Sequence, residues 1–267
     1  MLQIAGIEEF DGRAYRDEHR LRSDMNLAMA VQRQLLPRTA SHIPSLRYAA
    51  MSSAARGVSG DYYDFLHLGP DSLGIVLADV SGKGIAAALL MANLQASIRC
   101  ESAHGAQDLL GMLRRVNTHF FASTLPHQYA TLFFGRYDEQ TRKLVYVNCG
   151  HNAAILIRED GSIRRLEATA RPLGMFEEWD GDAKTVELLP GDRLYVCSDG
   201  VYEAGLETGC EFGEEGLISV VQAEPGQDVE CAVARIARAV CAYSPAGLTD
   251  DMTILSAFVH HDVSLNG

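Results

Sequence analysis

Aspartates at the ends of strand-like segments are the residues of this sequence best placed to do chemistry. Each stands where an apolar run begins or ends, and the set is Asp61, Asp79, Asp199, Asp250 and Asp251. At such a position a short acidic side chain can point into a cleft that backbone carbonyls also approach. A single aspartate of this kind is more often an ordinary turn or cap residue. Because several acids share the same setting, we predict that four of them, including one of the adjacent pair, converge on one site.

Converging carboxylates need positive charge, since like charges packed together cannot all ionise without being neutralised. Ligands that are all oxygen favour the hard divalent cations Mg²⁺ and Mn²⁺ over Zn²⁺. Two such ions about 3.5 to 4 Å apart can share a bridging water, lower its pKa and clamp a phosphoryl oxygen for in-line attack. The acids therefore indicate phosphate-ester chemistry.

Other catalytic motifs are incomplete. The segment Gly82-Lys83-Gly84 lacks the Ser or Thr and the first glycine of a nucleotide-binding loop, and residues 57–61 lack the last glycine of a nucleophile elbow. We interpret His151 as an ordinary hydrogen-bonded histidine rather than a catalytic base. Lys83 is equally compatible with a solvated side chain and with one that steers a phosphorylated substrate.

The cysteines and histidines do not form a recognisable metal motif. Six cysteines and nine histidines show no CxxC, HxxxH or HExxH spacing, which disfavours a zinc site. We interpret the cysteines as buried thiols of a protein in the reducing cytoplasm.

Composition limits the class of protein. The 267 residues are 47% hydrophobic and 22% charged, which is typical of a globular chain. The formal net charge of −12 disfavours general binding to nucleic acid, because the chain and a phosphate backbone repel each other. The longest strictly apolar run, residues 85–92, is far shorter than the roughly twenty residues that cross a bilayer. The first residues also lack the pattern of a secretory signal. We therefore expect neither nucleic acid nor a membrane as a partner.

The elements that must position the acids follow from hydrophobic patterning and turn residues. Short strand-like runs occupy residues 46–52, 61–68, 73–79, 129–137, 143–148, 153–158, 183–188, 193–197 and 252–259. Helical patterns come in two pairs, at residues 85–99 with 106–122 and at residues 214–222 with 229–243. Strands grouped between helix pairs predict an α+β fold in which helices cover antiparallel sheets.

A further helical pattern covers residues 15–36 and should end before Pro37. Its seam of Leu21, Met25, Ala28, Gln32 and Leu35 spans two heptads, too few to establish a coiled coil. We consider dimerisation through this seam as a hypothesis. The predicted division of the chain is an N-terminal helix at 1–37, one domain at 38–260 and a tail at 261–267.

Seven ordered motifs resemble those of a known family. They are AVQRQLLP at 30–37, VSGDYYD at 58–64, ADVSGKG at 78–84, NCGHN at 148–152, PGDRL at 190–194, SDG at 198–200 and DDMT at 250–253. In this order they resemble bacterial PP2C-like serine/threonine phosphatases of the RsbU and SpoIIE type. The resemblance covers residues 28 to about 260.

The resemblance implies an α-β-β-α sandwich with a two-metal centre of Mn²⁺ or Mg²⁺ at one edge. Asp79 would bridge both ions together with the carbonyl of Val80, Asp61 would hold one ion, and Asp199 and Asp250 the other. Asp251 is the less favoured member of its pair, although the sequence leaves a swap open. The nucleophile would be metal-bound water, so no protein nucleophile is needed.

The sequence departs from the family pattern in three places. Ser59-Gly60 replaces a glycine pair, Ala153-Ala154 replaces prolines, and His151 stands where some relatives carry an aspartate for a third metal. None of these changes removes a principal ligand, so we favour an active enzyme over a non-catalytic binding module of the same fold that sequesters a signalling partner. A phosphatase of small molecules with the same metal chemistry is a second alternative.

The resemblance also implies partners. The substrate would be phosphoserine or phosphothreonine on a small anti-anti-sigma-like (STAS) protein of a partner-switching pathway. The helix before the domain resembles a regulatory linker, and the segment ahead of it is too short for a sensor domain. We therefore expect regulation by an activator protein, by homodimerisation, or none.

Overall fold

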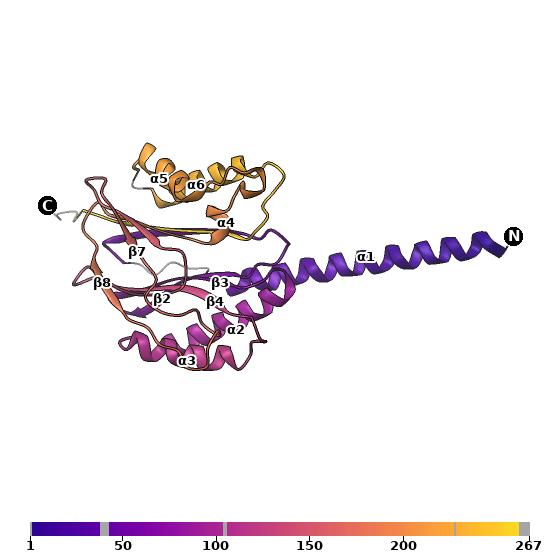
Figure 1. The fold of residues 1–267 in the computed structure, drawn as a ribbon, viewed down its shortest axis with the longest axis horizontal. Helices are drawn as coiled ribbons and strands as arrows, with labels where there is room; N and C mark the ends of the chain where they lie inside the picture. The colour runs from indigo at the N-terminus through magenta and orange to yellow at the C-terminus, as the bar shows by residue number, and fades with distance from the viewer. Residues whose placement is uncertain (1, 38–42, 104–105, 227, 262–267) are drawn as a thin grey trace.

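Two five-stranded antiparallel sheets face each other in the computed structural model, with a pair of helices on the outer face of each (Figure 1). The structure describes residues 2–37, 43–103, 106–226 and 228–261. One sheet has the strand order β1-β10-β9-β6-β7 and the other the order β2-β3-β4-β5-β8. The predicted α-β-β-α sandwich is confirmed.

The first sheet consists of β1 (Leu46–Ser53), β10 (Met252–Val259), β9 (Arg193–Cys197), β6 (Ala154–Ile157) and β7 (Ile163–Leu166). The second consists of β2 (Asp61–Gly69), β3 (Ser72–Val80), β4 (Ala130–Asp138), β5 (Lys143–Cys149) and β8 (Lys184–Glu187). The helices are α1 (Leu2–Leu35), α2 (Ile85–Ser102), α3 (Leu109–Phe121), α4 (Asp199–Tyr202), α5 (Gly213–Ala223) and α6 (Val229–Tyr243), and a 3₁₀ turn covers Leu206–Thr208.

Apolar side chains fill three layers of core, one between the sheets and one under each helix pair. The central strands therefore have no solvated face. All eight residues of β10 are buried, because α6 packs on one face of the strand and β2 lies on the other. This burial on both sides holds the strand ends, where the acids sit, on a rigid frame.

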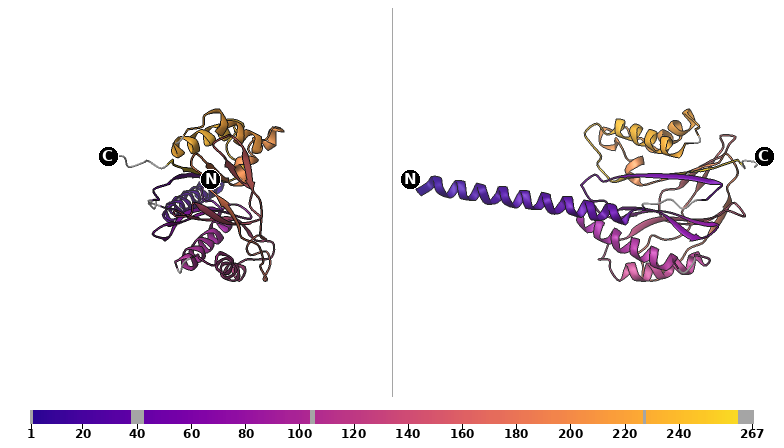
Figure 2. Two further views of the ribbon diagram at one scale, coloured as in Figure 1. Left: turned by 90° about the vertical axis from the view of Figure 1, so that its left-hand side faces the viewer. Right: turned by 180° about the vertical axis from the view of Figure 1, so that it is seen from behind.

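Helix α1 extends away from the sandwich along most of its length (Figure 2). It is longer than the predicted helix at its N-terminal end, and it ends at Leu35, as Pro37 predicts. Among the side chains that the structure describes, those in its C-terminal part contact the body, where Met25 and Met29 lie close to Gly57. In the described part of the chain, no helix is long and apolar enough to cross a membrane.

Three elements were absent from the sequence prediction, namely strand β7, helix α4 and the 3₁₀ turn at Leu206–Thr208. Strand β7 pairs with β6 through the turn at residues 158–162, but its two central residues are exposed arginines, so it has no apolar alternation to detect. The short helix α4 begins at Asp199, where the sequence suggested only a break.

The interpretation of all six cysteines as buried was wrong. Cys149 and Cys197 are buried, whereas the remaining four, Cys100, Cys210, Cys231 and Cys241, are exposed. Of the predicted tail, residues 262–267 lie outside the described residues.

Candidate metal centre

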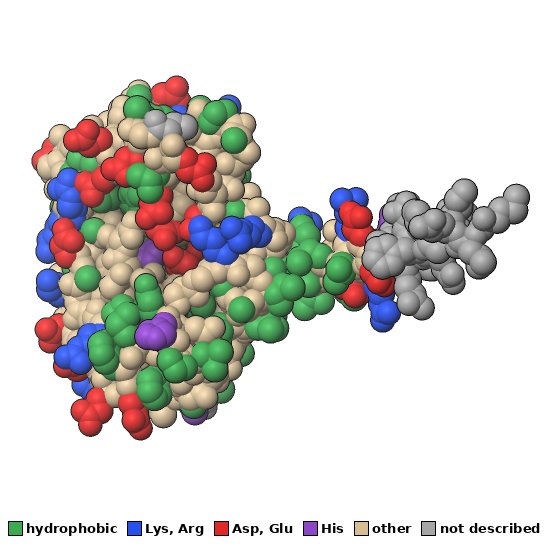
Figure 3. Space-filling model, turned by 45° about the vertical axis from the view of Figure 1, so that its right-hand side comes forward, with side chains coloured by type: hydrophobic (Ala, Val, Ile, Leu, Met, Phe, Trp, Pro, Cys, Tyr) green, Lys and Arg blue, Asp and Glu red, His purple; other side chains and the backbone are tan. Residues whose placement is uncertain are grey.

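The predicted acids come from both sheets and meet at one edge of the sandwich. Asp61 is the first residue of β2 and is paired in register with Asp79 on β3. Asp199 follows β9 as the first residue of α4, and Asp250 precedes β10 in the facing sheet. Figure 3 shows acidic side chains gathered on this face between the two helical layers, with basic side chains at their edge.

Asp61 is the most enclosed of these acids. Its side chain is 2% exposed, and neither carboxylate oxygen has a hydrogen-bond partner among the described residues. Burial, and then the charge of Asp79, raise the pKa of Asp61 well above its usual range, while the nearby hydroxyls of Thr253 and Ser198 act in the opposite direction. A buried carboxylate without a partner is costly, so the site fits a cation that would bind these oxygens.

The pKa values of Asp79 and Asp199 are also raised, by burial and by neighbouring carboxylates. Burial, followed by the charges of Asp199 and Asp250, raises the pKa of Asp79 to about 7. Burial, followed by the charges of Asp250 and Glu203, raises the pKa of Asp199 to about 6. Shifts of this kind mark functional sites more often than ordinary surface.

A third acid joins Asp199 and Asp250. Ligand oxygens of Asp199, Glu203 and Asp250 all lie within 4.8 Å of one another. Sequence reasoning missed Glu203. It lies four residues after Asp199, and because α4 makes one helical turn, this spacing places both acids on the same face. The spacing could have identified Glu203 only if Ser198-Asp199-Gly200 had been recognised as a helix start.

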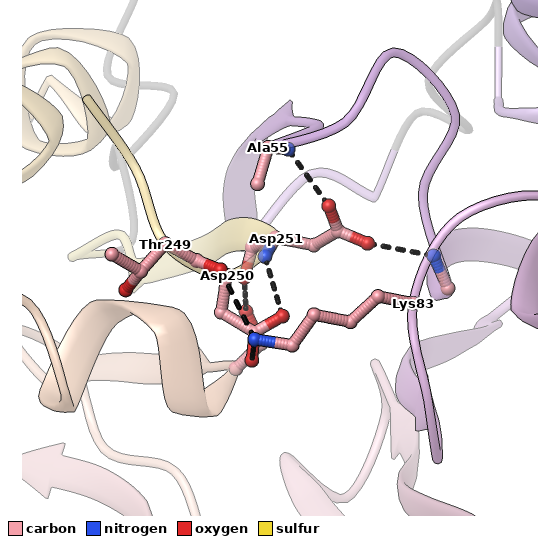
Figure 4. A network of polar contacts seen from close by, with 7 residues as sticks. Ala55, Lys83, Thr249, Asp250 and Asp251 are labelled. Carbon is pink, nitrogen blue, oxygen red and sulfur yellow. Dashed lines mark hydrogen bonds and ion pairs between the residues drawn. The ribbon is translucent and has the colours of Figure 1, made fainter.

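Asp250 and Asp251 make different contacts (Figure 4). Asp251 accepts hydrogen bonds from the backbone N–H of Ala55 through Oδ1 and of Gly60 through Oδ2, both at 2.8 Å. Asp250 instead directs Oδ2 to the Nζ of Lys83 at 2.6 Å. Both oxygens of Asp251 are therefore engaged with the segment that leads into Asp61, while Asp250 faces the acidic cluster.

Close backbone approach at the start of β2 favours glycine at position 60. A Cβ there would lie 3.0 Å from the carbonyl oxygen of Val80 and 3.2 Å from the Cβ of Ala87. The N–H of Val80 donates to the carbonyl of Gly60 at 3.3 Å. Val80, whose carbonyl is the predicted ligand, directly follows Asp79 and is thus held beside Gly60, the residue before Asp61.

His151 is buried. Its Nδ1 is 2.8 Å from the Oγ1 of Thr131, and its backbone N–H donates to the Oδ1 of Asn148. Burial lowers the pKa of His151 to about 4, so the ring is neutral near pH 7. The Nδ1 contact agrees with the interpretation of His151 as a hydrogen-bonded histidine, whereas its Nε2 is buried and has no hydrogen-bond partner among the described residues.

The sequence model of the family described as Stage II sporulation protein E (SpoIIE) matches residues 69–260. The chain belongs to the SpoIIE family. It is 31% identical over 209 residues to the phosphoserine phosphatase RsbU of Bacillus subtilis, a match that covers 74% of this chain and 61% of RsbU. The other curated relatives are covered to a smaller extent, so the chain spans less than two thirds of the lengths of the relatives it matches.

Solved structures show the same fold. The SiaA-PP2C domain of Pseudomonas aeruginosa has a TM-score of 0.77 at 20% identity, with 92% of this chain and 98% of that chain covered. The catalytic domain of the serine/threonine phosphatase PstP, solved with two manganese ions, has a TM-score of 0.61 at 22% identity, with 81% and 99% covered. This SpoIIE-family chain therefore has the PP2C-type fold.

Proposed function

We propose that this chain is a metal-dependent phosphatase that hydrolyses phosphoserine or phosphothreonine on a protein. The observation that carries the proposal is the Asp61 carboxylate, which is buried, lacks a hydrogen-bond partner among the described residues and lies in register with Asp79. Similarity to RsbU, a phosphoserine phosphatase, supports the substrate class.

The acids fit two divalent cations held by oxygen. Asp79 is central, because it interacts electrostatically with Asp61 and with both Asp199 and Asp250. We assign Asp61 to one ion and Asp199 with Asp250 to the other, with Asp79 and the carbonyl of Val80 shared. Carboxylate and carbonyl ligands suit Mn²⁺ or Mg²⁺, in keeping with the two manganese ions of PstP.

When bound, such ions supply an activated water and neutralise the charge that develops on the phosphoryl group. The protein's own residues position the site. Strands β2 and β3 fix Asp61 and Asp79, α4 fixes Asp199 and Glu203, and Asp251 fixes the backbone ahead of Asp61. No side chain is required as a covalent nucleophile in this arrangement.

The proposed substrate is a small anti-anti-sigma-like (STAS) phosphoprotein in a partner-switching pathway, with an activator protein as a second partner. Similarity to RsbU over most of this chain supports this assignment. The test is turnover of a phosphorylated STAS protein compared with a sugar phosphate. Preference for the sugar phosphate would contradict a phosphoprotein substrate.

Homodimerisation through α1 is part of the same proposal. Leu21, Leu27 and Val31 are 70%, 66% and 56% exposed on this helix, and an exposed apolar stripe is better stabilised when a second helix covers it. Two members of the predicted seam are used differently, since Met25 lies near Gly57 and Gln32 bonds Ser59 within the chain. Light scattering at high protein concentration tests this assignment, and a monomer would contradict it.

The catalytic proposal is tested with p-nitrophenyl phosphate. Purified protein is stripped with EDTA and titrated with Mn²⁺ beside the variant Asp199→Asn. We expect metal-dependent turnover in the wild type and none in the variant. Mn²⁺ binding without turnover, even of phosphoprotein, would instead indicate a non-catalytic module that sequesters its partner.

A further inference from the structure

Lys83 connects the two halves of the acidic cluster. It lies between β3 and α2, and its Nζ is 2.6 Å from Oδ2 of Asp250 and 3.0 Å from the carbonyl oxygen of Thr249, to which it donates (Figure 4). Both partners precede β10 in the opposite sheet. The side chain of Lys83 is 38% exposed, so the contact lies at the mouth of the site rather than in the core.

The charge of Lys83 acts on the acids beyond its direct partner. It lowers the pKa of Asp79 and of Asp199, opposing the increases caused by burial and by the other carboxylates. The ammonium group therefore already does, in part, what a bound cation would do.

Glycine occupies the positions on either side of Lys83. Gly82 has φ of 96° and Gly84 has φ of 74°, and a Cβ on either would meet no atom within 4 Å. Helix α2 begins at Ile85 without a side-chain cap. The ammonium group is thus carried on a long side chain between two glycines whose positive φ angles few other residues adopt.

We propose that Lys83 is the resident cation of the metal-free site and becomes a phosphate-binding residue when divalent cations replace it on Asp250. This inference rests on the proposed function. Oδ2 of Asp250 cannot keep its ammonium partner and also bind a divalent cation without strong repulsion between the two positive charges. The displaced ammonium stays at the exposed rim of the acidic cluster, where it can donate to the phosphoryl oxygens of an incoming phosphoserine.

The first experiment measures Mn²⁺ binding to the EDTA-stripped full chain by isothermal titration calorimetry. Lys83→Met removes the competing charge, so we expect Mn²⁺ to bind about two- to fivefold more tightly than to the wild type, the range that a partly exposed ion pair contributes. Lys184→Met, an exposed position on β8, makes the same change in net charge away from the site and should match the wild type. Lys83→Gln is a second variant with the same expected result, and circular dichroism verifies that each variant is folded.

The second experiment measures phosphate binding to the Mn²⁺-loaded proteins. Inorganic phosphate and a non-hydrolysable phosphonate analogue of a phosphoserine peptide are titrated separately, which distinguishes product from substrate recognition. We expect both to bind Lys83→Met about two- to fivefold more weakly than the wild type and the Lys184→Met control. Weakening for inorganic phosphate alone would overturn a role in substrate binding.

The outcomes separate this inference from the proposed function. Wild-type protein that binds no Mn²⁺ would contradict the metal centre itself, and the role of Lys83 with it. Wild-type binding of Mn²⁺ with unchanged affinity in Lys83→Met would overturn only the resident-cation role. Tighter Mn²⁺ binding together with weaker phosphate binding would support both steps.

Discussion

Asp61 and Asp79 lie directly opposite each other across the antiparallel pair of β2 and β3. Like charges at opposed positions destabilise a sheet, and here one of the two carboxylates is almost completely buried. The fold tolerates this pair because the surrounding strands are fixed by apolar packing on both faces. The pair therefore lowers the stability of the fold, and this loss serves function if, as we propose, cations bind to the two carboxylates.

Asp79→Asn should therefore separate stability from activity. Removing the charge opposite Asp61 relieves repulsion, so we expect the midpoint of thermal unfolding of the metal-free protein to rise by about 2 to 6 °C near pH 7.5. Turnover of p-nitrophenyl phosphate with Mn²⁺ should fall to background. Calorimetry and a phosphatase assay measure the two effects on one preparation.

Asp182→Asn, an exposed position with the same change in charge, serves as the control and should alter neither property. An Asp79→Asn protein that is less stable than the wild type without metal would show that Asp79 supports the fold.

Stability should depend on pH in opposite directions with and without metal. The pKa of Asp79 is about 7 when folded against 3.8 ordinarily, so the folded chain holds this proton more tightly than the unfolded chain. Protonation of Asp79 thus favours folding, and this contribution is lost as pH rises from about 4 to about 7. Mn²⁺ binds the deprotonated carboxylate of Asp79. In excess Mn²⁺ the protein should therefore be more stable near pH 7.5 than near pH 5.

His151 must be separated from this effect. Its pKa is about 4 when folded against 6.5 ordinarily, so its contribution is present above pH 6.5 and is lost as pH falls toward 4. Wild type and Asp79→Asn share this contribution of His151, so the difference between their EDTA-stripped unfolding midpoints at each pH reports Asp79 together with its electrostatic interactions with Asp61 and Asp199. A difference that does not change between pH values of about 5 and about 7.5 would refute the prediction.

The strand ends were predictable because local patterns specify them. Asp61, Asp79 and Asp250 flank apolar runs whose length and boundaries match the observed strands to within a few residues. Buried strands of this kind are recognisable because both faces are apolar. The family motifs then indicated that these strand ends meet, which the patterns alone do not establish.

Features that depend on distant contacts or on helix phase were not predictable. The hydrogen bonds of Asp251 connect residues 196 and 191 positions apart in the sequence, and no local pattern distinguishes Asp251 from Asp250. Cys231 and Cys241 lie in an apolar segment, yet the buried face of α6 excludes both. Glu203 required the unrecognised helix α4.

Gln32 should position the segment that carries Asp61. Its amide accepts from the N–H of Ser59 at 2.9 Å and donates to the carbonyl of Ser59 at 2.7 Å, two residues before Asp61. The side chains of Gln32 and Asp61 also border one cavity of about 230 Å³ between α1 and the sandwich. Because each hydrogen bond contributes about 0.5 to 1.5 kcal/mol, Gln32→Ala should loosen this segment by about 1 to 3 kcal/mol.

Hydrogen exchange at the Ser59 amide and Mn²⁺ affinity measure the effect of Gln32→Ala, and we expect faster exchange and weaker binding. The control is Gln34→Ala, which changes an exposed glutamine on the same helix. It alters helix propensity by the same amount as Gln32→Ala. If the two variants exchange at the same rate, Gln32 does not hold the segment.

Asp250→Asn and Asp251→Asn should differ in kind. Asp250 faces Lys83 and the acidic cluster, so its amide variant should weaken Mn²⁺ binding by more than about tenfold while leaving the free energy of unfolding without metal unchanged or higher.

Asp251 is 7% exposed and accepts two backbone N–H groups. Its amide variant turns one acceptor into a donor, which leaves a buried N–H unpaired and should cost about 1 to 3 kcal/mol in the free energy of unfolding. Urea denaturation with EDTA and calorimetric titration with Mn²⁺ measure both quantities for both variants. The reverse pattern, a stable Asp251→Asn protein that no longer binds Mn²⁺ beside an Asp250→Asn protein that does, would exchange the roles assigned to these neighbours.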